Sequence, residues 1–114
     1  MKHEESRIQE AVVTYLRHQY PHALYCASAG GVRTSMKQAI MMKRTGYVRG
    51  FPDLMILESS KEYKGLFIEM KTEKGVASKE QKWWKEQLNA RGYRSEICKG
   101  FDSAKQLIDE YLQS

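Results

Sequence analysis

Two apolar segments joined by a polar turn place the strongest constraint on the fold of this chain. Residues 53–57 are apolar except for Asp53 at their start, which is typical of a central strand. Residues 59–65 are mostly polar and end in a glycine, so they favour a turn. Residues 66–71 then return as the simplest antiparallel partner. The sequence therefore predicts a hairpin within a sheet.

The returning segment has an acid and a base on one of its faces. Side chains alternate along a strand, so Glu69 and Lys71 share the face of Phe67, while the other apolar residues point the opposite way. The hairpin also brings Glu69 back near Asp53. Because burying charged groups costs free energy, a bound cation or a reacting group is the simplest explanation for this cluster.

The residue types in this cluster suit a hard divalent cation. Asp53, Glu69 and the backbone carbonyl of Met70 offer the oxygen ligands that Mg²⁺ and Mn²⁺ prefer. The ammonium of Lys71 can orient an attacking water and stabilise charge that develops on a phosphoryl group. A zinc site is not expected, because neither the histidines nor the cysteines have the ligand spacing. The pattern is that of metal-dependent phosphodiester hydrolysis.

The remaining segments predict helices and further strands around the hairpin. Apolar spacing indicates helices over 3–20, 35–45, 78–91 and 103–112, and strands over 24–27 and 93–98. Gly30-Gly31 breaks the first of these strands, and Ser78 with Gln81 fits a capping box. At 114 residues the chain suits one compact domain, so we expect a single α/β domain over 1–114.

The first helix presents one carboxylate toward the expected site. Its apolar stripe includes Val12 and Leu16, and Glu5 lies one turn ahead on the same side, whereas Glu10 falls on the far face. Glu4 competes with Glu5 for this position. A glutamate in the first turn is also favoured by the helix dipole alone, which is the structural alternative.

Two other helices carry expectations about packing. In the second helix, Met36, Ala39 and Ile40 predict a core-facing stripe. In the third, Trp84 is expected in the core, while Trp83 either packs at an edge or stacks on a base.

Positive charge is concentrated in the first half of the chain. Residues 1–50 hold eight Lys or Arg against three Glu, and no acid occurs between Glu10 and Asp53. A basic run that leads into a carboxylate site suits a polyanionic substrate, although a solvated basic surface is the simpler alternative. The basic helix over 35–45 can contact either a DNA backbone or a second subunit. The candidate DNA contacts are Arg33, Lys37, Lys43, Arg44, Arg49 and Lys74.

The composition favours a cytoplasmic protein. No stretch approaches the roughly 20 apolar residues that span a bilayer, so no membrane partner is expected, and the N-terminus does not resemble a secretory signal. Cys26 and Cys98 can in principle pair, but their apolar, strand-like contexts favour free buried thiols in a reducing compartment.

Four motifs in order resemble the virus-type replication-repair nuclease (VRR-NUC) family of the PD-(D/E)XK nuclease superfamily. They are Glu5-Ser6-Arg7-Ile8-Gln9, Gly50-Phe51-Pro52-Asp53, Glu69-Met70-Lys71 and Ser78-Lys79-Glu80-Gln81-Lys82-Trp83. The resemblance implies an αβββαβ core with a mixed central sheet flanked by helices. It also implies Mg²⁺ or Mn²⁺ dependence, DNA as substrate and, for small stand-alone members, homodimers that act on branched DNA such as four-way junctions.

Carried over by position, the resemblance assigns a role to each matching residue. Asp53 and Glu69 would bind the metal, and Lys71 would be catalytic. Glu5 would reach the metal directly or through water, and Gln81 would support the site, although capping alone also explains Gln81. The expected setting is the cytoplasm of a bacterial or phage-infected cell.

The hypothesis from the sequence is a metal-dependent, structure-selective endonuclease that leaves 5′-phosphate and 3′-hydroxyl ends on branched DNA. Two alternatives stay open. One is a non-catalytic DNA-binding module with a basic face, and the other is a nuclease that acts on RNA, because no residue marks a reader of the 2′-hydroxyl.

Overall fold

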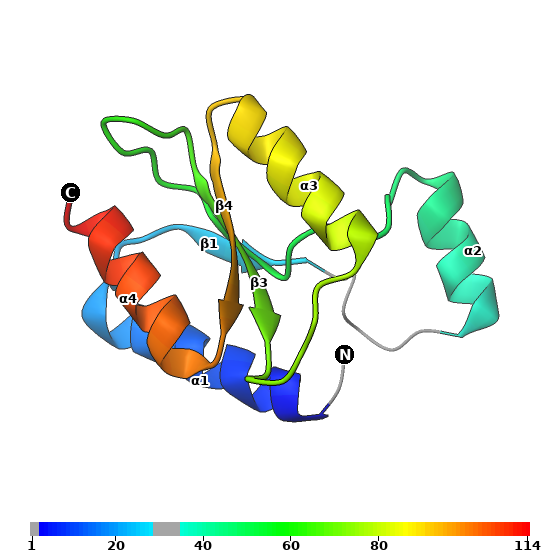
Figure 1. Ribbon diagram of the computed structural model, residues 1–114, viewed down its shortest axis with the longest axis horizontal. Coiled ribbons are helices and arrows are strands. Elements are labelled where there is room, and N and C mark those ends of the chain that lie inside the picture. Colours follow the sequence, from blue (N-terminus) through cyan, green and yellow to red (C-terminus); the bar gives the residue numbers. More distant parts are fainter. Residues whose placement is uncertain (1–2, 29–34) are drawn as a thin grey trace.

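The computed structural model describes residues 3–28 and 35–114. Eight elements follow one another along the chain (Figure 1): α1(His3–Gln19), β1(Tyr25–Ala27), α2(Met36–Arg44), β2(Leu54–Ile56), β3(Leu66–Lys71), α3(Lys79–Ala90), β4(Arg94–Lys99) and α4(Phe101–Leu112). Every helix and strand expected from the sequence is present within a few residues of its predicted bounds. The predicted break at Gly30-Gly31 lies outside the described residues.

The four strands form one mixed sheet in the order β1-β2-β3-β4. Strand β2 is antiparallel to both β1 and β3, and its pairing with β3 is the predicted hairpin. Strand β4 runs parallel to β3, because α3 carries the chain back to the starting end of the sheet. The predicted fold class, an α/β fold with helices around a mixed sheet, is confirmed.

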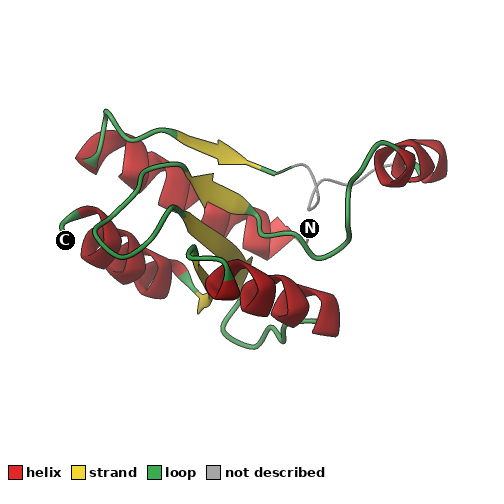
Figure 2. Cartoon of the chain, turned by 90° about the horizontal axis from the view of Figure 1, so that it is seen from above, coloured by secondary structure: helices red, strands yellow, loops and turns green. Residues whose placement is uncertain are grey.

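One face of the sheet packs on α1 and α4, which also contact each other (Figure 1 and Figure 2). Leu66, Ile68 and Met70 of β3 point to this side and are completely buried. They meet Val12 and Leu16 of α1 and the apolar stripe of α4, all within one core cluster. This core fixes which face of β3 carries Glu69 and Lys71, because successive side chains alternate.

The opposite face is covered by α3 and a row of aromatic rings. Phe51 lies edge-on against Trp84 at 4.9 Å and against Phe67 at 5.9 Å between ring centroids. Trp84 is half-buried, not a core residue as predicted, because the loop before β2 covers only part of its ring and takes its indole N–H as a donor. Trp83 is 51% exposed, which agrees with its predicted place at an edge.

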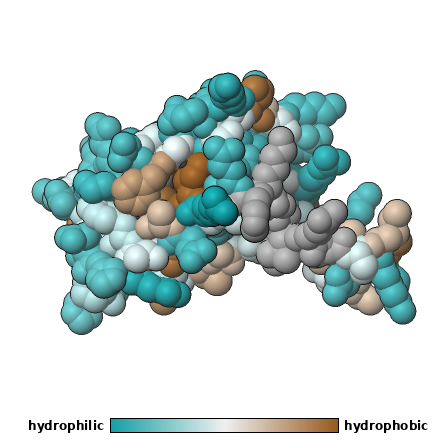
Figure 3. Space-filling view, turned by 90° about the horizontal axis from the view of Figure 1, so that it is seen from below, coloured by the Kyte–Doolittle hydropathy of each residue, from teal (hydrophilic) through white to brown (hydrophobic). Residues whose placement is uncertain are grey.

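Helix α2 stands apart from the body of the molecule. It projects at one end in Figure 1, and in Figure 3 it forms the lobe at the right, where apolar and hydrophilic side chains lie side by side. The predicted core stripe of Met36, Ala39 and Ile40 is wrong, because α2 contains no buried residue. Spacing shows that a helix has an apolar side, but it does not show whether the chain itself covers that side.

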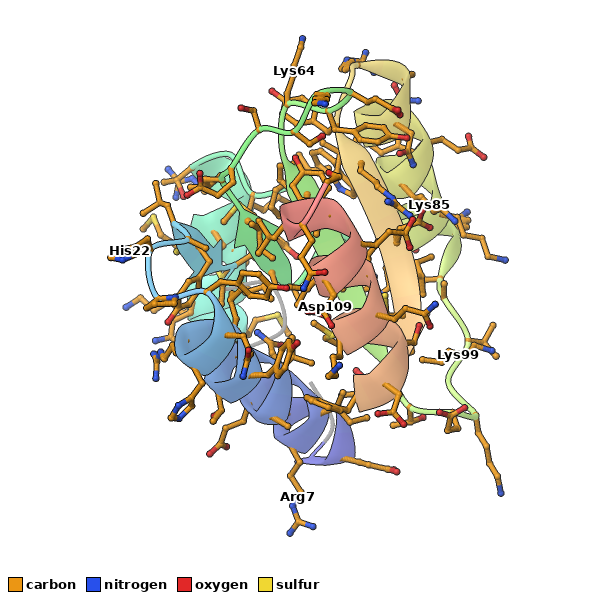
Figure 4. All side chains as sticks on the ribbon, turned by 90° about the vertical axis from the view of Figure 1, so that its left-hand side faces the viewer. Arg7, His22, Lys64, Lys85, Lys99 and Asp109 are labelled. Carbon is orange, nitrogen blue, oxygen red and sulfur yellow. The ribbon has the colours of Figure 1, made fainter. Side chains whose placement is uncertain are left out.

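The first and last helices are joined by a polar cluster centred on Asp109. One oxygen of this carboxylate accepts hydrogen bonds from the hydroxyls of Tyr15 and Tyr20, both at 2.6 Å, and Lys105 donates to the other at 3.1 Å. Figure 4 shows Asp109 on α4 directed toward α1. These bonds lower the pKa of Asp109, the largest contribution being that of Tyr15. The cluster holds α1, and with it Glu5, against the sheet.

Both cysteines are free thiols. Cys98 is buried as predicted, but Cys26 is exposed, because β1 is the edge strand of the sheet and its outer side has no covering helix among the described residues. None of the described helices is both long and apolar enough to cross a bilayer.

Candidate active site

The register of the central hairpin places Asp53 opposite Glu69. Leu54 pairs with Ile68. Asp53 comes one residue before Leu54 and Glu69 one residue after Ile68, so in this antiparallel pair the two acids lie next to each other on the face that α3 covers. Both residues are buried: Asp53 is 5% exposed and Glu69 is 6% exposed. Asp53 Oδ2 accepts the Met70 N–H at 2.8 Å, and the Asp53 carbonyl accepts the Ser28 N–H at 2.9 Å. Main-chain bonds from two neighbouring strands thus fix the aspartate.

Gln81 has two roles. In the capping box of α3 its side-chain oxygen accepts the Ser78 N–H at 2.9 Å, as the sequence predicts. Its amide nitrogen donates to Glu69 Oε2, also at 2.9 Å. Capping alone therefore does not account for Gln81, because the same amide connects the first turn of α3 to the buried glutamate.

Both acids have a raised pKa. Burial is the largest cause of the raised pKa of Asp53. For Glu69, burial and then the charge of Asp53 raise the pKa to about 9. Lys71 lowers the pKa of both groups and Glu5 raises it, so both of these side chains lie near the pair.

The acids lie in a cleft of about 280 Å³. That volume is just below the roughly 300–1,000 Å³ that is typical of ligand pockets, so it suits a small group such as one phosphodiester and an ion. The cleft is lined by Glu5, Tyr47, Arg49, Gly50, Phe51, Asp53, Glu69, Lys71, Val76, Ser78 and Gln81. The carboxylates and the lysine singled out in the sequence thus share one cleft.

The donor set fits Mg²⁺ or Mn²⁺. Among residues 3–28 and 35–114, no three carboxylate, imidazole or thiol side chains lie close enough together to hold a metal by themselves. Magnesium commonly takes one or two carboxylates and completes its shell with water and substrate phosphate. Asp53 and Glu69 supply such a pair, and a divalent ion would compensate the negative charge that burial disfavours at both groups.

The predicted DNA contacts fall into three groups. Arg49 lines the cleft, whereas Lys74 is exposed in the loop after β3 and does not line it. Lys37, Lys43 and Arg44 lie on the projecting helix α2 and take part in none of the described ion pairs. Arg33 lies outside the described residues.

Tyr47 lines the cleft and was not identified from the sequence. In the sequence, Tyr47 is marked only by following Gly46, the glycine after α2. A glycine at that place predicts a turn of the backbone, but it does not predict where the next side chain points.

The loop before Asp53 is held tightly against α3. Trp84 Nε1 donates to the Arg49 carbonyl at 3.1 Å. Gly50 has a φ of +93°, and a Cβ placed on it would lie 2.7 Å from the backbone carbon of Glu80. Only glycine allows this approach, which sets the distance between Asp53 on the loop and Gln81 on α3.

Replacing Gly50 with alanine should therefore lower both stability and activity. The positive φ costs about 1 kcal/mol for a residue with a Cβ, and the contact with Glu80 adds to that cost by pushing the loop away from α3. Urea unfolding measures the loss of free energy. Gly46→Ala is the matched control, because Gly46 has a φ of +114° but nothing within 4 Å of its added Cβ. Equal losses in the two variants would show that the close approach contributes nothing.

Comparisons with known proteins identify related folds. A family model described as the VRR-NUC domain matches residues 2–102. One solved structure, a VRR-NUC domain protein, is 27% identical, with 99% of this chain and 91% of that chain covered and a TM-score of 0.84. A second, a VRR-NUC domain, shares the fold at 19% identity and a TM-score of 0.63, with 94% and 96% covered. No curated protein sequence matches the chain.

Proposed function

The chain belongs to the VRR-NUC family of nuclease domains, and we propose that it is a Mg²⁺- or Mn²⁺-dependent endonuclease of branched DNA. The observation that supports this most strongly is the buried pair of Asp53 and Glu69 beside Lys71 in one cleft. A nuclease family and a pair of acids suited to a hard cation point to the same chemistry.

In this proposal each side chain has a separate task. Asp53, Glu69 and the Met70 carbonyl hold the metal, and Glu5 reaches it directly or through water. When bound, the ion supplies Lewis acidity toward the phosphate and lowers the pKa of water. Lys71 orients the attacking water and stabilises the charge on the phosphoryl oxygens, while Gln81 keeps Glu69 in place. The products carry 5′-phosphate and 3′-hydroxyl ends.

We also propose that two copies act together on a four-way junction. Resolving a junction takes two cuts, and the cleft holds one acid pair, so a twofold-symmetric dimer would supply the second. Helix α2 offers uncovered apolar side chains for such a contact, with Met36 79% and Ile40 53% exposed. Sedimentation of the purified protein tests this: the mass of two chains supports a dimer, and a monomer bound to one junction contradicts it.

Cleavage assays separate the candidate functions. Flaps, forks and four-way junctions are incubated with Mg²⁺, with Mn²⁺ or with EDTA, alongside RNA versions of the same structures. The proposal predicts metal-dependent cuts in DNA, most rapid on a branched form. Binding without cleavage under every condition would support a non-catalytic DNA-binding module instead, and a preference for the RNA versions would support an RNA nuclease.

The basic residues of α2 should contribute to the salt dependence of DNA binding. Each lost phosphate contact reduces the slope of log affinity against log salt by about 0.9, so Lys43→Gln/Arg44→Gln should reduce it by about 2. Fluorescence anisotropy at several salt concentrations measures this. Lys61→Gln/Lys64→Gln removes two exposed charges from the loop before β3, far from the cleft, and should leave the slope unchanged. The same slope in both double variants would remove α2 from the DNA interface.

A further inference from the structure

Tyr47 is placed by the end of α2. Gly46 adopts a left-handed φ of 114°, its N–H bonds to the Lys43 carbonyl at 3.3 Å, and the Tyr47 N–H bonds to the Met42 carbonyl at 2.8 Å. These two bonds form the Schellman motif that commonly ends a helix at a glycine. The motif turns the chain sharply from α2 toward the cleft, so Tyr47 is the first residue of the loop that leads to Asp53.

The other end of the same loop is fixed on α3. The indole of Trp84 holds the Arg49 carbonyl, and Gly50 touches the backbone of Glu80. Tyr47 thus sits between two anchored ends, half-buried in the wall of the cleft beside Arg49. Because both ends of this loop are fixed, its backbone needs little further ordering when the cleft binds a ligand.

The Tyr47 hydroxyl has a proton to donate. Among the hydrogen bonds of the described residues, none uses the Tyr47 O–H as its donor. Burial raises the pKa of Tyr47, and the charges of Glu69 and Asp53 act in the same direction, so the phenol stays protonated at neutral pH.

We propose that Tyr47 donates a hydrogen bond to a non-bridging oxygen of the phosphodiester held in the cleft and, together with Arg49, positions the DNA strand against the acid pair. This inference rests on the proposed function. A phenol suits the place because it is neutral. The cleft already holds Lys71 and Arg49, and a further cation next to Asp53 and Glu69 would pair with them and compete with the metal, whereas a neutral donor binds the phosphate and leaves both carboxylates free.

The contact is tested by removing the phosphate oxygen and the Tyr47 hydroxyl, separately and together. Four-way junctions that carry a single methylphosphonate, moved one position at a time along one strand, are bound in Ca²⁺ by wild type and by Tyr47→Phe. A methylphosphonate has lost one non-bridging oxygen. Hydrogen bonds to charged groups are strong enough that wild type should bind one of these junctions about tenfold more weakly. Tyr47→Phe has already lost the donor. The methylphosphonate at that position should therefore weaken its binding by a factor about tenfold smaller than it does for wild type.

Tyr93→Phe is the matched control. Its ring packs edge-on against Phe67 at 5.4 Å and does not line the cleft, so this variant should keep the wild-type pattern. If Tyr47→Phe also keeps that pattern at every position, the assignment of Tyr47 is overturned, whether or not the protein cuts DNA. If the predicted difference is seen but no junction is cleaved in Mg²⁺ or Mn²⁺, the phosphate contact stands and the proposed nuclease activity fails.

Discussion

Asp53→Asn is expected to reduce DNA cleavage by at least about a thousandfold without destabilising the protein. Asparagine keeps an oxygen to accept the Met70 N–H, so the hairpin should be preserved. It also replaces a buried charge with a neutral group, and the variant should therefore unfold at the same temperature as wild type or higher. Single-turnover cleavage and thermal unfolding measure the two effects.

The control is Asp102→Asn, which removes an equal charge from the exposed first turn of α4. It should cleave as wild type does. Cleavage by Asp53→Asn within tenfold of wild type would show that the reaction does not depend on this carboxylate. A large loss of stability would show that the aspartate serves the fold more than the chemistry.

The second large effect concerns metal and pH. Glu69 titrates near its ordinary pKa of 4.5 in the unfolded chain, but near 9 in the metal-free folded protein. Between these values the folded state holds the extra proton, so the free energy of unfolding should fall as the pH rises from 6 to 9. A divalent ion that replaces this proton should remove the fall. At a hundred times its dissociation constant it stabilises by about 2.7 kcal/mol, which amounts to a rise of roughly 10 °C in Tm.

Thermal unfolding in EDTA and in Mn²⁺ at several pH values measures this. In EDTA, the stability of Glu69→Gln should not fall between pH 6 and pH 9, and Mn²⁺ should give it little of the stabilisation that it gives wild type. This variant keeps a side chain that can hydrogen-bond to Gln81. The account fails on this point if the stability of metal-free wild type rises from pH 6 to pH 9, or if Mn²⁺ stabilises Glu69→Gln as much as wild type.

The central hairpin could be predicted because it depends on residues that are close together in the sequence. Alternation decides which side chains of β3 share a face, and a short turn decides that β2 and β3 pair, so the approach of Glu69 to Asp53 follows from nearby residues alone. The capping box of α3 is also local. The position of α3, however, is tertiary information, and for this reason the bond from Gln81 to Glu69 did not follow from the sequence.

The errors have the same origin. Spacing identified α2 as a helix with Met36 and Ile40 on one side, but spacing carries no information about what covers that side. Tyr47 reaches the cleft through a turn that depends on Gly46 and on the close approach at Gly50. The roles of the site residues, from Glu5 to Lys71, are predictions. The fold brings these residues into one cleft, as those roles require.

The most direct test is the location of a metal ion in a crystal soaked with Mn²⁺ and measured for anomalous scattering. We predict one peak between the carboxylates of Asp53 and Glu69, at about 2.0–2.4 Å from an oxygen of each, with the Met70 carbonyl also in reach. The same crystals of Asp53→Asn should lose the peak. No peak at the acid pair at saturating Mn²⁺, or a peak bound only by side chains elsewhere, would contradict the account.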